Sequence, residues 1–309
     1  MKKPNFFLIG APKAGTTAFA DYLAMHPQVF MSSIKEPHFY SSDLPNLGIN
    51  DRSRYEALFA DAGEQHRIVG EASVSYLGSQ VALPRILEEY PNAKFLVLLR
   101  NPISMAVSFY YHAIINGWER AATFEEAWNL QPARKRGEHI PPRCSSPIVL
   151  QYKHLCSIGS QFEKVCKLVS RENLHTIVFD DFVADPSRIW MELQDFLGVD
   201  YDFREKFPKM NKRKVYRSLF WADLMWPLMR TMRTYATNKL IRYALIGTYK
   251  VLTKPSTEIS MSPDFVRHLN AEFESEVSLL SSCMKRDFSH WLQEPYGTCP
   301  SLTPPRVLI

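Results

Sequence analysis

A loop of small residues with a single lysine is the strongest chemical signal in this sequence. Residues 10–17 (GAPKAGTT) lie between an apolar run at 6–9 and a stretch with helical character. Small residues let the backbone approach a ligand, and the first turn of the following helix offers unpaired N–H groups at the positive end of its dipole. This arrangement favours an anion, above all a phosphate, and Lys13 would add a full positive charge.

The same loop resembles a Walker A loop, G-x-x-x-x-G-K-[ST], only in part. Gly10 and Gly15 have the required spacing, but Thr16 stands where that pattern has its lysine, and Lys13 lies three positions upstream. The displaced lysine argues against a P-loop kinase or NTPase acting on a small molecule, which remains the first alternative. A non-catalytic, membrane-associated nucleotide-binding module is the second alternative.

A second candidate anion site follows the apolar run FLVLL at 95–99. Arg100 comes directly after the run, and Pro102 is suited to the first turn of a helix. Ser108 lies two turns into that helix, so its hydroxyl can point back toward Arg100. An arginine presents planar paired donors that match a phosphate group.

Together, P-x-K-A-G-T-T and R-N-P-x(5)-S-[FY]-Y resemble the PAPS-dependent sulfotransferases, in which PAPS is 3′-phosphoadenosine-5′-phosphosulfate. The motif style is nearest to the carbohydrate and bacterial types, and similar stretches occur at residues 26–40, 70–77 and 285–292. The resemblance implies PAPS as sulfuryl donor and no metal. It also implies a 5′-phosphosulfate site at Lys13, Ala14, Gly15, Thr16 and Thr17, and a 3′-phosphate site at Arg100 and Ser108.

Sulfuryl transfer to a hydroxyl needs a base, and the segment KEPHFY at 35–40 offers two candidates. Glu36 is the first, because burial beside Pro37 and Phe39 is expected to raise its pKa. The segment resembles the K-E-x-H-F-F motif of carbohydrate-type sulfotransferases, whose glutamate is the proposed base. His38 is the alternative, since small-molecule sulfotransferases use a histidine. A structural ion pair of Glu36 with Lys35 or Arg54 is the non-catalytic interpretation.

Further candidates surround these groups. Glu71 and Ser73 follow an apolar run at 68–70 and are interpreted as acceptor-side or supporting groups. Lys212 and Arg213 complete the 3′-phosphate site or belong to a solvated basic run. Residues 221–254 combine basic and aromatic side chains, which suit peripheral membrane contact, packing on the core or an extended acceptor groove.

Apolar runs and helical stretches alternate along the chain, which is typical of an α/β fold with a parallel sheet. The expected strands are at 6–9, 68–70, 95–99 and 174–179, and the expected helices are at 17–25, 81–90, 103–115, 147–170 and 263–292. We expect one domain over residues 1–309 with P-loop-like topology. Residues 1–218 would form its cofactor-binding core, and residues 219–309 a helical part packed on that core.

Composition excludes several other classes of protein. The 309 residues carry 37 Lys and Arg against 32 Asp and Glu, and an excess of +5 is too small for a dedicated nucleic-acid binder. Five cysteines without a C-x-x-C pair argue against a disulfide framework or a zinc cluster. The N-terminal apolar run is too short for a signal peptide, and no run reaches 18 residues. The sequence therefore predicts a cytoplasmic enzyme that sulfates a hydroxyl of a small molecule or glycan, most typically a carbohydrate or glycolipid.

Overall fold

The structure is a computed structural model. It describes residues 2–44, 48–144, 146–204, 206–207, 214–216, 225, 247–248, 251–255 and 261–293.

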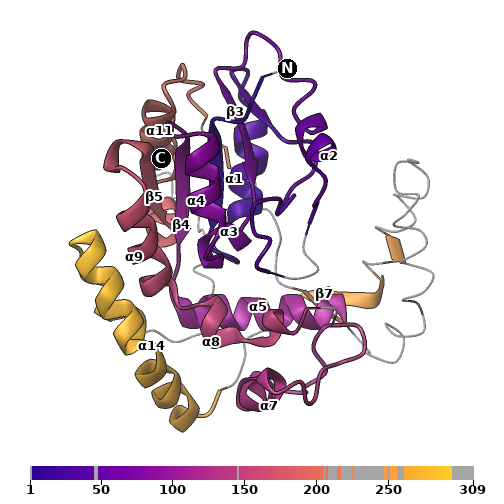
Figure 1. Cartoon of the computed structure of the whole chain (residues 1–309). Helices are drawn as coiled ribbons and strands as arrows, with labels where there is room; N and C mark the ends of the chain where they lie inside the picture. The colour runs from indigo at the N-terminus through magenta and orange to yellow at the C-terminus, as the bar shows by residue number, and fades with distance from the viewer. Residues whose placement is uncertain are drawn as a thin grey trace.

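A five-stranded parallel sheet forms the centre of the molecule (Figure 1). Its strands, in spatial order, are β2 (Val29–Met31), β3 (Ile68–Ala72), β1 (Phe6–Gly10), β4 (Lys94–Leu99) and β5 (Leu174–Val178). Every residue of β1 and β3 is buried, which explains their nearly continuous apolar sequences, because helices cover both faces of such a sheet. The expected α/β fold with a central parallel sheet is confirmed, with β1 and its loop in the middle.

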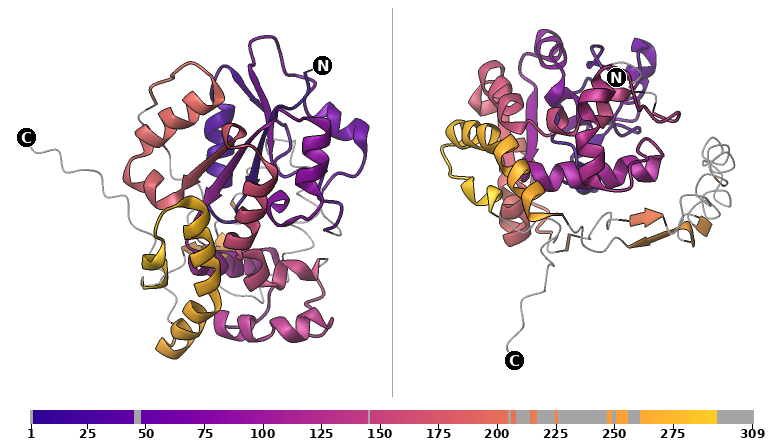
Figure 2. Two further views of the ribbon diagram at one scale, coloured as in Figure 1. Left: turned by 60° about the vertical axis from the view of Figure 1, so that its left-hand side comes forward. Right: turned by 90° about the horizontal axis from the view of Figure 1, so that it is seen from below.

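Helices surround the sheet and continue beyond it (Figures 1 and 2). The described α-helices are α1 (Thr16–Ala24), α2 (Arg52–Ala57), α3 (Ser75–Gly78), α4 (Ala82–Glu89), α5 (Pro102–Asn116), α6 (Phe124–Asn129), α7 (Gln131–Lys135), α8 (Tyr152–Leu155), α9 (Ile158–Leu168), α10 (Phe179–Ala184), α11 (Pro186–Leu197) and α14 (Pro263–Met284). Three short 3₁₀ turns are η1 (Pro147–Leu150), η2 (Arg171–Asn173) and η3 (Ser289–Leu292), and β6 (Lys214–Tyr216) pairs antiparallel with β7 (Thr253–Pro255). The long helix α14 packs against α9.

The expected helix at 147–170 is wrong as a single element. It is divided into η1, α8 and α9, because Gln151 and Ser157 have non-helical backbone angles. The expected helix at 263–292 ends at Met284, where Lys285 takes a left-handed conformation with φ of 52°. The edge strand β2 was not predicted, because three residues give too short a pattern.

The described residues bear on two expectations from sequence, one about the cysteines and one about membrane-spanning segments. Among the described residues, Cys144, Cys156, Cys166 and Cys283 are free thiols, and Cys299 lies outside the described part. Within the same described part, no helix is long and apolar enough to cross a membrane.

Candidate active site

The candidate residues meet at one edge of the sheet. Strands β3, β1 and β4 are neighbours and run parallel, so the segments after their carboxyl ends lie side by side. These segments carry Ser73, residues 10–17 and Arg100 in turn. Tertiary structure therefore brings together three stretches that are far apart in the sequence.

Glycine is required at the end of β1 and again in the loop that follows it. A Cβ on Gly10, where φ is 153°, would lie 2.7 Å from the Cβ of Leu77. Gly15 has φ of 99° and precedes α1, so no side chain caps the first N–H groups of that helix. Ala14 and Thr16 are buried and Thr17 is half-buried. The loop thus has the backbone geometry expected of an anion site.

Arg100 connects the two predicted anion loops. Its guanidinium donates to the carbonyl oxygen of Lys13 at 2.9 Å and lies 4.7 Å above the centre of the Phe179 ring. The helix that follows is capped by Asn101, whose side chain accepts hydrogen bonds from two first-turn N–H groups. Ser108 lies on this helix and is half-buried.

Glu36 and His38 converge beside these loops. The backbone N–H of Glu36 donates to the carbonyl of Ala72 at 2.9 Å, which fixes the segment to the end of β3. Glu36 forms an ion pair with Lys35, and its Oε2 lies 3.5 Å from Nε2 of His38. The other ring nitrogen of His38 lies 2.6 Å from Oγ of Ser75.

Three candidate residues have a left-handed backbone. The φ angles are 64° for Lys13, 62° for Glu36 and 53° for His38, although none is a glycine. Such conformations cost of order 1–3 kcal/mol each and cluster at active sites. Their coincidence with the residues selected from sequence supports a functional role for this edge of the sheet.

The expected rise in the pKa of Glu36 is wrong. Burial does raise it, but the hydrogen bond from His38 and the charge of Lys35 outweigh burial and lower the pKa to about 2. An ion pair of Glu36 with Lys35 or Arg54 was the alternative interpretation from sequence, and the structure forms the pair with Lys35. With this low pKa, Glu36 is ionised at neutral pH.

The pKa of Lys13 is lowered to about 8. Burial is the largest cause, repulsion from Arg100 and Lys35 adds to it, and the carboxylate of Glu36 opposes it. The charge of Lys13 thus interacts with that of Arg100 and with that of the candidate base Glu36. These groups form one electrostatic unit.

Glu71 and Ser73 lie behind the site. Both side chains are fully buried, which favours the supporting role over contact with an acceptor. Glu71 accepts hydrogen bonds from the hydroxyls of Ser73, Tyr76 and Tyr55 at 2.5, 2.6 and 3.1 Å. The Ser73 hydroxyl in turn accepts the backbone N–H of His38 at 3.0 Å. Burial raises the pKa of Glu71, and the three hydroxyls partly offset this rise.

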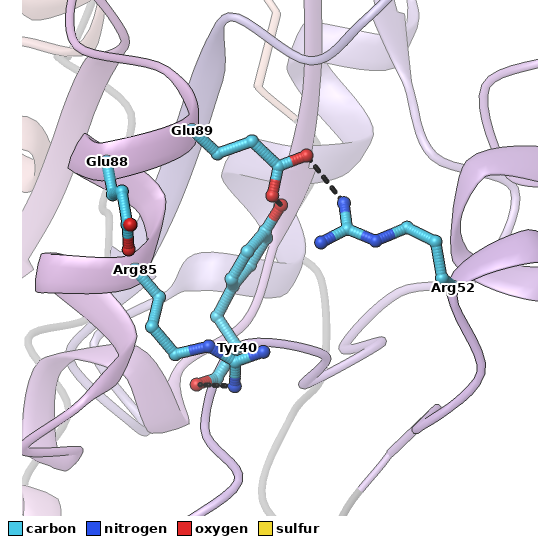
Figure 3. A pocket seen from close by; sticks show the side chains of 5 residues that line it. All are labelled: Tyr40, Arg52, Arg85, Glu88 and Glu89. Carbon is cyan, nitrogen blue, oxygen red and sulfur yellow. Dashed lines mark hydrogen bonds and ion pairs between the residues drawn. The ribbon is translucent and has the colours of Figure 1, made fainter.

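A pocket of about 330 Å³ is lined by Tyr40, which ends the KEPHFY segment, and by Arg52, Arg85, Glu88 and Glu89 (Figure 3). Glu89 accepts hydrogen bonds from Tyr40 and Arg52 at 2.8 and 2.5 Å. Arg85 donates to the carbonyl of Tyr40 at 3.3 Å. These contacts hold Tyr40, and the lining includes none of the predicted site residues.

His112 is a site neighbour to which the sequence analysis gave no role. It lies four residues after Ser108 on α5, and residues at this spacing share one face of a helix. Its pKa is lowered to about 4 by surrounding protein and by the charges of Lys13 and Lys35, while Glu36 acts in the opposite direction. The four-residue interval between Ser108 and His112 was the signal in the sequence. It indicates a site residue only when Ser108 is known to lie near the site.

Two further expectations concern the basic pair Lys212 and Arg213 and the metal ion. Lys212 and Arg213 lie outside the described residues. Across the part of the chain that is described, no group of three or more His, Cys, Asp or Glu side chains is placed to hold a metal ion.

Comparison with known proteins agrees with this geometry. The model of the family described as "Sulfotransferase domain" matches residues 3–219. A crystal structure of a sulfotransferase from Alicyclobacillus acidocaldarius is 28% identical, covers 94% of this chain and 99% of its own, and has a TM-score of 0.69. The similarity between the two structures therefore extends over nearly the whole chain.

Curated relatives match over shorter regions. Membrane-associated sulfotransferase kil1 of Dictyostelium discoideum is 34% identical over 36% of this chain and 23% of its own length. Human carbohydrate sulfotransferase 15 is 30% identical over 35% of this chain and 27% of its own. A mouse bifunctional heparan sulfate N-deacetylase/N-sulfotransferase 4 is 27% identical over 65% of this chain and 23% of its own. The chain thus spans about a quarter of the length of these relatives.

The family match covers well over half of the sequence and includes both anion loops and the Glu36 segment. It confirms the resemblance to the sulfotransferases that was drawn from the motifs. The chain belongs to the sulfotransferase domain family.

Proposed function

We propose that the protein transfers the sulfuryl group of PAPS in line to an acceptor hydroxyl of a carbohydrate or glycolipid, with Glu36 as general base. The observation that carries this proposal is the electrostatic unit at the strand edge. Lys13 interacts with the carboxylate of Glu36 and with the guanidinium of Arg100, so a candidate base and two anion-binding cations share one site.

The donor would occupy the two loops. The N–H groups of residues 14–17 and the charge of Lys13 suit the 5′-phosphosulfate, since helix N-termini bind phosphates. Arg100 and Ser108 suit the 3′-phosphate, and we assign Lys212 and Arg213 to the same end of the donor as a proposal. The hydrogen bond from Arg100 to the Lys13 carbonyl keeps the two loops together.

In the proposed reaction, Glu36 removes the acceptor proton while the acceptor oxygen bonds to sulfur. The bond between sulfur and the bridging oxygen of the donor breaks, and PAP (3′-phosphoadenosine-5′-phosphate) leaves with that electron pair. Lys13 stabilises the negative charge that develops on the bridging oxygen. The proton ends on Glu36.

Glu36 suits the role of base better than His38 does. Its side chain is 36% exposed against 11% for His38, and both ring nitrogens of His38 face protein oxygens. A carboxylate with a pKa of about 2 is a weak base, since proton transfer is most efficient when the pKa lies near the working pH. We propose that the anionic donor draws Lys35 away from Glu36 and raises the pKa of Glu36. His38 then orients the carboxylate.

The acceptor class rests on two similarities. The KEPHFY segment resembles the corresponding motif of carbohydrate-type enzymes, and two matching relatives are named for carbohydrate and heparan sulfate sulfation. The cytoplasmic location and the membrane contact through residues 221–254 remain predictions from sequence.

A donor test separates this proposal from the kinase alternative. We expect PAPS to support turnover in the presence of a metal chelator and ATP with magnesium to support none. Turnover with ATP and magnesium alone would favour the P-loop kinase instead.

Arg100→Ala is expected to weaken PAP binding about 10- to 100-fold, because a phosphate would lose charge-assisted hydrogen bonds. Ser108→Ala should cause a smaller loss. Isothermal calorimetry with PAP measures both, and Arg188→Ala is the control, since Arg188 makes surface ion pairs with Glu192 and Asp185. An unchanged affinity in Arg100→Ala would remove Arg100 from the site.

The pH profile should reflect Lys13. Its ammonium is present below its pKa of about 8 and is lost above it, so kcat/KM for PAPS should fall above about pH 8. With bound PAPS the donor's charge favours the protonated lysine, so kcat should persist to higher pH. In Lys13→Arg the fall in kcat/KM should disappear, because a guanidinium stays charged. An identical fall in that variant would assign it to another group.

A further inference from the structure

We infer that the C-terminal segment Arg286–Trp291 positions the groups that hold the 3′-phosphate of the donor, and that Trp291 is its central positioning residue. The inference rests on the proposed function of Arg100 and Ser108. We call residues 286–291 the C-terminal clamp. Figure 2 shows this part of the chain, which follows α14, beside the sheet.

The clamp acts on two neighbouring strand ends. Leu99 of β4 pairs with Val178 of β5, so Arg100 and Phe179 directly follow the ends of two adjacent strands. The Arg100 guanidinium lies on the Phe179 ring. A Cβ added to Gly15 would lie 3.7 Å from the same ring. The Phe179 ring therefore lies between Gly15 and Arg100 and supports the Arg100 guanidinium from one side.

Trp291 connects the loops that carry these residues. It is fully buried, its indole N–H donates to Oδ2 of Asp180 at 2.8 Å, and its carbonyl oxygen accepts from the Asn101 side chain at 2.6 Å. Asp180 follows Phe179, and Asn101 follows Arg100. Trp291 thus holds Arg100 and Phe179 in place through the residues that follow them, Asn101 and Asp180.

Two other contacts hold the clamp in place. Arg286 forms a bidentate ion pair with Asp181, in which its two terminal nitrogens lie 2.5 and 2.9 Å from the two carboxylate oxygens. Phe288 is fully buried and lies with its ring centre 4.5 Å from that of Trp291. The left-handed Lys285 ends α14 and turns the chain into this arrangement.

The clamp also reaches Ser108 indirectly. The oxygen of the Asn101 side chain caps α5 by accepting from Ile103 and Ser104 at 2.9 and 3.1 Å, while its nitrogen donates to Trp291. The start of α5 is therefore fixed relative to the clamp, and Ser108 lies on that helix. Both residues assigned to the 3′-phosphate depend on the same buried tryptophan.

Affinity for PAP and for 5′-AMP, which lacks the 3′-phosphate, tests the inference in the full chain. We expect Trp291→Phe, which keeps a buried ring but loses the indole N–H, to weaken PAP binding about tenfold and leave 5′-AMP binding unchanged. Asn101→Ser keeps a good helix cap and loses the bond to Trp291, so it should have the same selective effect. Calorimetry gives both affinities.

Trp190→Phe is the matched control, because the buried indole of Trp190 also donates to a carboxylate, that of Asp202, at 2.6 Å. It should leave the ratio of PAP to 5′-AMP affinity at its wild-type value. No loss, or equal losses for both nucleotides, in Asn101→Ser and in folded Trp291→Phe would overturn the inference. If Trp291→Phe fails to fold, Asn101→Ser decides. A wild-type protein that binds PAP no more tightly than 5′-AMP would instead contradict the proposed 3′-phosphate site.

Discussion

Glu36→Gln is expected to lower kcat by about 10²–10⁴, the usual contribution of a positioned proton acceptor, while PAP still binds. The amide keeps the size and the left-handed position of Glu36 but cannot take the acceptor proton. Initial rates at saturating PAPS and calorimetry with PAP separate the chemical step from donor binding. The pairing of Glu36 with Lys35 adds a second readout, because Lys35→Met should raise the low pKa of the carboxylate.

His38→Asn is the companion variant for the base assignment. We expect a smaller loss than in Glu36→Gln, because His38 contacts Glu36 and Ser75 and is nearly buried. Full activity in Glu36→Gln together with a large loss in His38→Asn would transfer the role of base to His38. Loss of PAP binding in Glu36→Gln would show that the residue holds the donor and does not act on the acceptor.

Lys13→Met is expected to lower kcat by about 10²–10³, the range found when one transition-state donor is removed. Methionine keeps the unbranched side chain and loses the charge that faces the leaving group. Burial already lowers the lysine pKa to about 8, so its ammonium is incompletely solvated in the free protein and is available to a bound anion. Single-turnover rates with saturating PAPS measure the effect on the chemical step.

Lys94→Met provides the control for that variant. Lys94 is also a half-buried lysine with a pKa lowered by burial, but it begins β4, at the opposite edge of the sheet from Arg100. Its substitution should leave kcat unchanged. Equal losses in both lysine variants would mean that stability, and not leaving-group stabilisation, explains the result for Lys13.

The sequence predicted the strand, turn and helix around each candidate anion loop well because their signals are local. The spacing of Gly10, Lys13 and Gly15, and the order of Arg100, Pro102 and Ser108, specify a strand, a turn and a helix with short-range contacts alone. The central strands were predictable for a similar reason, since buried parallel strands have continuous apolar sequences. The interruption at Gln151 was not predictable, because glutamine is an ordinary helical residue by type. Ser157 was a weak signal, because serine is common at helix starts.

Electrostatics and long-range contacts were beyond sequence reasoning. The contacts of His38 and Lys35 with Glu36 decide the direction of the shift in the carboxyl pKa, and no motif encodes their geometry. Trp291 meets Asp180 and Asn101 across 111 and 190 positions, so its role becomes visible only when the sheet aligns the ends of β4 and β5. The same holds for His112, whose proximity to Lys13 depends on how α5 packs.

The most direct test of the account is transfer of label from PAPS carrying radioactive sulfur, with glycans, glycolipids, phenols and peptides offered as acceptors and a metal chelator present. The account predicts a labelled carbohydrate or glycolipid, one PAP released for each sulfate transferred, and no product with Glu36→Gln. Absence of label on every acceptor, together with no binding of PAP by the wild-type protein, would contradict it.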